Sequence, residues 1–165
     1  GNNATSKTGE YFRNNVWWWR PLWDYCETVA PELCANVDGH SNSGDGLDGA
    51  GALELAKALF NEIDSGRTKA YQDEYMLALA DLPREGCGIC NSTGIRTDEL
   101  GVEHGHPTKE LSTEVAILTG RTHGWCNGCD GVGTKENWMA HYPFSVENVE
   151  EFAQFLMDSG GFSIC

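Results

Sequence analysis

Two stretches of the sequence repeat one pattern: residues 87–94 read Cys-Gly-Ile-Cys-Asn-Ser-Thr-Gly, and residues 126–133 read Cys-Asn-Gly-Cys-Asp-Gly-Val-Gly. The second copy matches Cys-x-x-Cys-x-Gly-x-Gly in full, whereas the first has Ser92 in place of the first glycine. Two cysteines separated by two residues occupy the ends of one tight turn, so their thiolates can hold one edge of a metal tetrahedron. The glycines that follow allow positive φ angles, which turn backbone N–H groups toward the sulfurs.

A second turn of the same kind supplies the opposite edge of the tetrahedron. The sequence therefore predicts that one structural zinc ion is bound by Cys87, Cys90, Cys126 and Cys129. The ion would close a loop over residues 91–125. Metal binding of this kind contributes on the order of 10 kcal/mol to folding, which is comparable to the stability of a whole domain.

Other uses of paired cysteines are weighed against zinc. A thioredoxin-type redox pair needs a strand before the first cysteine and a helix that starts at it, but residues 83–86 and 91–94 are rich in turn formers. An iron–sulfur centre stays open as an alternative, because four thiolates also suit it. His104, His106 and His123 are candidate ligands for a second metal or replacements for a cysteine, although loop histidines more often face solvent.

Outside the cysteine turns, apolar residues recur at steps of three and four, which predicts amphipathic helices. The expected helices cover residues 18–30, 48–65, 69–82, 107–119 and 146–158. Val115 to Leu118 also fit a strand. The stripe through Trp19, Trp23 and Cys26 is interpreted as an aromatic anchor for the core rather than a ligand platform.

These patterns predict an α+β, mainly α-helical fold. Helices surround an aromatic core, and a small four-cysteine zinc knuckle of short hairpins is formed by residues 87–96 and 122–135. Residues 1–10 are polar and are expected to form a flexible N-terminus. Residues 11–165 are expected to form a single domain.

The net charge of −14 limits the partners of the protein. An acidic surface repels phosphate, so nucleic-acid binding is disfavoured and another protein is the expected partner. No apolar stretch approaches the roughly 18 residues of a membrane helix, and no signal peptide is visible. The seven cysteines lack the regular spacing of a disulfide framework, which predicts a reducing cytoplasm.

A turn-rich loop at residues 38–48 suggests a calcium site, because Asp38, His40 and Asn42 occupy every second position. The EF-hand frame then fails, since Ser43 stands where glycine is needed and Gly49 where glutamate is needed. The loop is therefore interpreted as a connection that ends in a helix N-cap at Asp48.

The two cysteine turns resemble the zinc region of the DnaJ co-chaperone family, in which four such repeats bind two zinc ions. Two repeats imply one zinc ion here. A J-domain needs His-Pro-Asp, whereas residues 106–108 read His-Pro-Thr, so the resemblance implies the zinc ligands and no co-chaperone activity. The whole chain also resembles uncharacterised proteins of tailed bacteriophages, through Trp-Arg-Pro-Leu-Trp at residues 19–23 and the run at residues 123–133.

A closed four-thiolate site has no vacant position for water, and the sequence contains no familiar catalytic motif. We therefore expect a non-catalytic, zinc-stabilised interaction or accessory protein of phage origin, acting in the host cytoplasm. One alternative is a small enzyme with a site near the 38–48 loop, His40, Asp45 and the Trp cluster. Another is a zinc-knuckle nucleic-acid binder, for which only Arg96, Arg121 and Lys135 lie near the cysteines.

Overall fold

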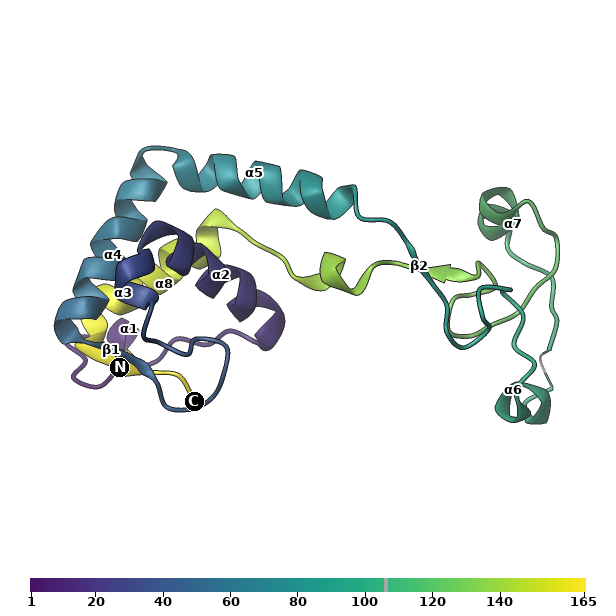
Figure 1. The fold of residues 1–165 in the computed structure, drawn as a ribbon, viewed down its shortest axis with the longest axis horizontal. Coiled ribbons are helices and arrows are strands. Elements are labelled where there is room, and N and C mark those ends of the chain that lie inside the picture. The colour runs from purple at the N-terminus through teal and green to yellow at the C-terminus, as the bar shows by residue number, and fades with distance from the viewer. Residues whose placement is uncertain (106) are drawn as a thin grey trace. The chain divides into compact units, whose positions relative to one another are not determined.

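The structure is a computed structural model that describes residues 1–105 and 107–165 (Figure 1). It consists of two compact units, of which unit 1 comprises residues 1–80 and 141–165, and unit 2 comprises residues 81–140. The predicted α+β, mainly helical class is confirmed, because helices dominate and the strands are few and short. The prediction of a single domain over residues 11–165 stays a prediction.

Unit 1 is built from helices and one pair of short strands. Its elements are α1 (Lys7–Glu10), α2 (Val16–Val29), α3 (Pro31–Cys34), β1 (Gly46–Asp48), α4 (Gly49–Asp64), α5 (Arg67–Ala80), α8 (Val146–Ser159) and β4 (Gly161–Ser163). Strands β1 and β4 pair antiparallel, with Leu47 opposite Phe162. Helices α4 and α8 pack against each other and, with α2, enclose the main core.

An aromatic cluster fills this core. The rings of Trp19 and Trp23 stack with their centroids 5.6 Å apart, and Phe152 meets Trp19 edge-on at 5.4 Å. Trp23 is fully buried, as is Cys26 on the same helix. The buried hydroxyl groups in the core have hydrogen-bond partners. Those of Tyr25 and Thr68 lie 2.8 Å apart and share a hydrogen bond. The predicted aromatic core is thus confirmed.

Helices α4 and α8 begin and end where the sequence predicts. The Asp48 side chain accepts a hydrogen bond from the Gly51 N–H at 2.8 Å, which satisfies a free donor in the first turn of α4. Ser145 caps α8 in the same way, by accepting from the Asn148 N–H at 3.1 Å. Gly160 ends α8 with φ of 62°, a left-handed conformation that favours glycine.

Helix α2 starts earlier than predicted. The Asn15 side chain accepts from the N–H groups of Trp17 and Trp18, both at 3.1 Å, so the helix begins at Val16 instead of near Trp18. Pro21 consequently lies inside the helix and cannot donate to the carbonyl four residues before it. Its ring is buried, and core packing offsets the missing hydrogen bond.

The N-terminal residues run along the end of α8. Asn2 and Asn3 donate their N–H groups to the carbonyls of Gly161 and Ser159 at 2.7 and 3.1 Å. The Ser6 hydroxyl donates to the Asp158 carboxylate at 2.6 Å. The flexibility predicted for residues 1–10 stays a prediction.

Unit 2 contains short elements joined by long loops. They are β2 (Glu85–Gly86), α6 (Glu99–Glu103), α7 (Thr113–Thr119), β3 (Thr134–Lys135) and the 3₁₀ helix η1 (Trp138–His141), whose last residue belongs to unit 1. Strands β2 and β3 pair antiparallel. None of the helices in the two described ranges has the length and apolar character that spanning a bilayer requires.

The helix predicted over residues 107–119 is shorter in the structure. Helix α7 begins after Ser112, whose side chain accepts from the Val115 N–H, and it ends at Gly120 as predicted. Leu111 lies outside the helix, because its N–H donates to the Thr122 carbonyl at 2.9 Å in a bridge between two extended segments. The predicted start of this helix, at residue 107, is therefore wrong.

Candidate metal centre

The four cysteines that the sequence predicts as zinc ligands lie close together in unit 2. The sulfurs of Cys87 and Cys126 lie 3.8 Å apart, those of Cys90 and Cys129 lie 3.7 Å apart, and all four lie within 4.8 Å of one another. Zinc–sulfur bonds of about 2.3 Å place the corners of a tetrahedron about 3.8 Å apart. A disulfide needs about 2.05 Å, and all four thiols are free. Spacing and donor type therefore fit one tetrahedral metal ion.

Each pair of cysteines forms a turn that directs a backbone N–H group at a sulfur. The Gly94 N–H donates to the Cys90 sulfur and the Gly133 N–H to the Cys129 sulfur, both at 3.2 Å. Both glycines have positive φ angles, 75° and 87°. The predicted role of these glycines is confirmed, since N–H donors of this kind orient and stabilise a metal-bound thiolate.

The first turn carries strain that the second avoids. Ser92 occupies the position of Gly131, and the two residues have φ angles of 62° and 80°. A left-handed conformation costs about 1 kcal/mol or more in a residue with a Cβ atom and little in glycine. The rest of each turn is alike, because the Ser92 N–H donates to the Cys87 carbonyl as the Gly131 N–H does to the Cys126 carbonyl.

The two turns are tied together by hydrogen bonds from outside the cysteine pairs. The Cys87 N–H donates to the Gly133 carbonyl at 2.9 Å, which continues the pairing of β2 and β3. The Arg121 guanidinium donates to the Thr93 carbonyl in one turn and to the Gly131 carbonyl in the other. A single side chain thus contacts both halves of the cluster. Sequence reasoning placed Arg121 near the cysteines but did not identify this role.

The surroundings of the sulfurs affect their ionisation in different ways. Burial raises the pKa of the Cys129 thiol to about 12, although the Gly133 N–H favours its thiolate. Burial also opposes ionisation of Cys87, but the N–H groups of Cys90 and Ile89, with hydrogen bonds from neighbouring thiols, outweigh it and lower its pKa to about 7. Four adjacent thiolates would repel one another, and a divalent cation would remove that repulsion.

Two of the three histidines considered as additional metal ligands, His104 and His123, lie at the surface. His123 is exposed, and its Nδ1 shares a hydrogen bond with the Thr122 hydroxyl at 3.1 Å. His104 is exposed at the end of α6. His106 lies outside the described residues. Among the described side chains, the group of metal-ligating atoms around the cysteines contains the four sulfurs and no histidine.

A second group of possible ligands lies in unit 1. Atoms of Asp24, Glu27 and His40 lie within 4.8 Å of one another, and all three residues are exposed. His40 Nε2 is 3.0 Å from the Asp24 carboxylate, and Glu27 accepts from the Trp23 indole N–H at 3.1 Å. Sequence reasoning noticed His40 but missed both carboxylates. Their spacing of three residues on α2 was the available signal.

The 38–48 loop itself is closed by its own hydrogen bonds. The Asp45 carboxylate accepts from the Asp38 N–H at 3.1 Å, and the Asp38 carboxylate accepts from the Ser41 hydroxyl at 2.7 Å. The Trp19 indole N–H donates to the Gly39 carbonyl at 2.6 Å, which ties the loop to the core. His40 therefore pairs with Asp24, whereas the Asp45 carboxylate binds a backbone N–H group of the loop.

No protein-family model matches the chain, and neither does any curated protein or solved structure. The resemblances to DnaJ-type turns and to tailed-bacteriophage proteins are therefore not supported beyond the residues that carry them. The fold and the site define a mainly helical α+β protein in which four buried cysteines are arranged to hold a metal ion.

Proposed function

We propose that the protein is a non-catalytic accessory protein whose unit 2 is organised by one structural zinc ion and presents a surface to another protein. The observation that supports the proposal is a set of four buried sulfurs that all lie within 4.8 Å of one another, with two of the separations at 3.7 and 3.8 Å. Cys87, Cys90, Cys126 and Cys129 would supply all four ligands. The ion would then have no vacant position for water or substrate and would act as a cross-link.

The sulfur spacing favours a single ion over an iron–sulfur cluster. The thiolates of such a cluster are shared among two or more iron atoms, which places the sulfurs farther apart than the ligands of one ion. All four sulfurs lie within 4.8 Å of one another, and separations of 3.7 and 3.8 Å match the edges of one tetrahedron. Zinc is the usual occupant of a closed four-cysteine site.

The composition of unit 2 supports a structural role for the ion. The buried hydrophobic side chains in its described part are the four cysteines and Leu111. A unit of this size without an apolar core needs another source of stability, and a metal ion is a common one. The ion would therefore take the place of a hydrophobic core.

The surface of unit 2 supports a protein partner. Ile117 is 79% exposed and Leu118 65% exposed, which is unusual for two large apolar side chains on one short helix. The net charge of −14 opposes nucleic-acid binding. The arginines near the cysteines give that alternative little support, because Arg96 forms a two-pronged ion pair with Asp98 and Arg121 binds backbone carbonyls.

Elemental analysis of the purified full chain tests the proposal. We expect one zinc ion per chain in the wild type and a clear loss in Cys129→Ser. The matched control is Cys165→Ser, which changes an exposed cysteine outside the cluster and should keep the zinc. A wild-type chain that binds no metal after reduction and incubation with zinc would overturn the proposal, and stoichiometric iron would overturn the metal assignment.

The group of Asp24, Glu27 and His40 favours one alternative, a small enzyme with a site near the 38–48 loop. An imidazole beside two carboxylates could move a proton or bind a cation. Against this, Trp23 is fully buried and is not available as a wall for substrate. A hydrolytic or transfer activity that disappears in His40→Ala, with the zinc content unchanged, would favour the enzyme.

A further inference from the structure

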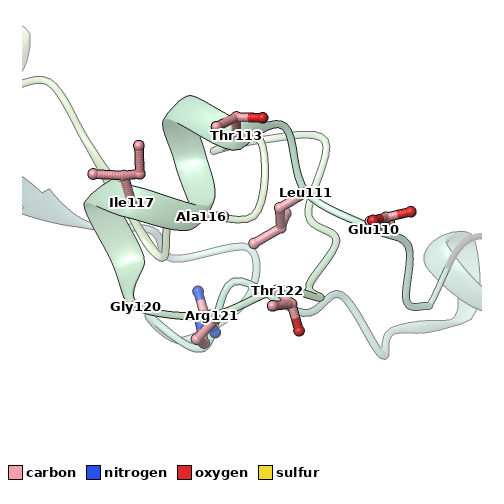
Figure 2. A pocket seen from close by; sticks show the side chains of 8 residues that line it. All are labelled: Glu110, Leu111, Thr113, Ala116, Ile117, Gly120, Arg121 and Thr122. Carbon is pink, nitrogen blue, oxygen red and sulfur yellow. The ribbon is translucent and has the colours of Figure 1, made fainter.

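Unit 2 has a groove beside α7 that the metal site does not use (Figure 2). Its volume is about 470 Å³. The lining residues come from α7 and from the extended segments on either side of it, and they are Glu110, Leu111, Thr113, Ala116, Ile117, Gly120, Arg121 and Thr122. Figure 2 shows Leu111 between the helix and Arg121.

The groove has an apolar floor and an apolar rim. Leu111, at 9% exposure, is the buried part, and Ile117, at 79%, projects from the helix. Helix α7 buries none of its residues, although Val115 to Leu118 are four apolar residues in succession. An exposed apolar surface next to a groove is typical of a site that binds another protein.

The groove rests directly on the cysteine turns. Leu111 packs so closely on Gly131 that a Cβ atom at Gly131 would lie 2.4 Å from a Leu111 methyl group. Arg121 lines the groove and also donates to the Thr93 and Gly131 carbonyls, one in each turn. The position of both lining residues therefore depends on the turns that would hold the ion.

The charge around the groove selects the partner. Glu110 lines the groove, and Glu114 lies in the first turn of α7. The positive charge of Arg121 is directed at backbone carbonyls inside the unit. The whole chain carries a net charge of −14, so a second copy would bring like charge to the same place. Lys109 precedes Glu110 but is not among the lining residues. A basic segment is complementary to the net negative charge of the chain, because its lysine or arginine can pair with Glu110 in the groove or with Glu114 beside it.

Resting on the proposed function, we propose that this groove binds a short segment of a partner protein. The segment places an apolar side chain against Leu111 and Ile117 and a lysine or arginine opposite Glu110 or Glu114. The metal centre fixes the positions of Leu111 and Arg121 through the cysteine turns and does not contact the segment. This groove is called the α7 groove below.

Selection from a library of random displayed peptides on the zinc-loaded full chain tests this inference. We expect enriched peptides to combine leucine, isoleucine, phenylalanine or methionine with lysine or arginine. Their affinity should fall by about tenfold or more in the double variant Ile117→Asn, Leu118→Asn. Both side chains are mostly exposed, so the variant should fold and keep its zinc.

The matched control is Met76→Asn, Leu77→Asn, which removes two similarly exposed apolar side chains from α5 in unit 1 and should leave peptide binding unchanged. Glu110→Gln should weaken binding by a few-fold and reduce its dependence on salt, because it removes one charge from the groove. Enrichment of acidic peptides, or of peptides that bind both double variants equally, would overturn the inference, and so would a selection without any enrichment.

Two further readouts separate the possible failures. Zinc bound in the usual ratio together with a failed selection would reject the α7 groove alone, whereas a chain without metal would reject the proposed function itself. Sedimentation of the wild type tests the other occupant. A dimer that disappears in Ile117→Asn, Leu118→Asn would mean that the surface binds a second copy, and the inference would be wrong.

Discussion

Replacing Cys126 by serine should unfold unit 2 and leave unit 1 folded. Cys126 is completely buried, and its sulfur lies 3.8 Å from that of Cys87 at the centre of the cluster. A hydroxyl is a poor zinc ligand, so the variant would keep at most three strong ligands. A structural zinc site contributes about 10–16 kcal/mol, and the loss of one ligand in four should therefore cost about 2.5–4 kcal/mol.

Unit 2 has few other interactions to offset this loss of stability. Burial of one leucine contributes about 2 kcal/mol, and Leu111 is the one non-cysteine hydrophobic residue buried in its described part. Unit 1 instead has 17 buried residues in one hydrophobic cluster of its own. The effect should consequently be confined to residues 81–140.

Hydrogen–deuterium exchange followed by mass spectrometry measures each unit separately. In Cys126→Ser, or in the wild type after chelation of the metal, peptides from residues 81–140 should exchange fast while those from α4 and α8 stay protected. Cys165→Ser is the control and should match the wild type. Protection of residues 81–140 that survives both ligand loss and chelation would refute the view that the metal replaces a core.

Three further changes test particular contacts. Arg121→Ala removes the hydrogen bonds to both turns and should lower the free energy of unfolding of unit 2 by about 2–3 kcal/mol, seen as easier removal of zinc by a competing chelator with the metal ratio unchanged. Ser92→Gly relieves a φ angle of 62° and should stabilise unit 2 by about 1 kcal/mol in denaturant titration; a loss of stability would contradict the assigned strain. Burial raises the pKa of Tyr75 from 10.0 to about 12, so between these pH values the folded state keeps a proton that the unfolded state loses. The free energy of unfolding should therefore fall as the pH rises from 10 to 12. In thermal melts at several pH values, Tyr75→Phe should make that fall less steep.

The local elements were predictable because their signals are short in range. The turns at Cys87 and Cys126 depend on spacing and on glycine, and the caps at Asp48 and Ser145 depend on a few neighbouring residues. The antiparallel pair of β1 and β4 was missed, because a three-residue strand has too few residues to show alternation. The start of α7 was misjudged because the bridge that removes Leu111 from the helix joins residues far apart in the chain.

The same distinction applies to the candidate sites. Cysteine spacing predicted which four residues come together, since a repeated turn is visible in the sequence. Nothing in the sequence brings His40 to Asp24, because their contact depends on how the loop folds back onto α2. The double contact of Arg121 was equally hidden, since it requires the final positions of two separate turns.

A metal-built unit has a consequence for its surface. In an ordinary small domain, large apolar side chains must turn inward, because their burial supplies the stability that ordering the chain requires. In the proposed metal-bound state, four cysteines and one ion supply that stability. Leu100, Ile117 and Leu118 are then not needed inside, and they are 54%, 79% and 65% exposed. Their exposure to water is unfavourable. Binding the proposed partner would bury them, so the proposed metal centre and the exposed apolar helix would serve the same interaction.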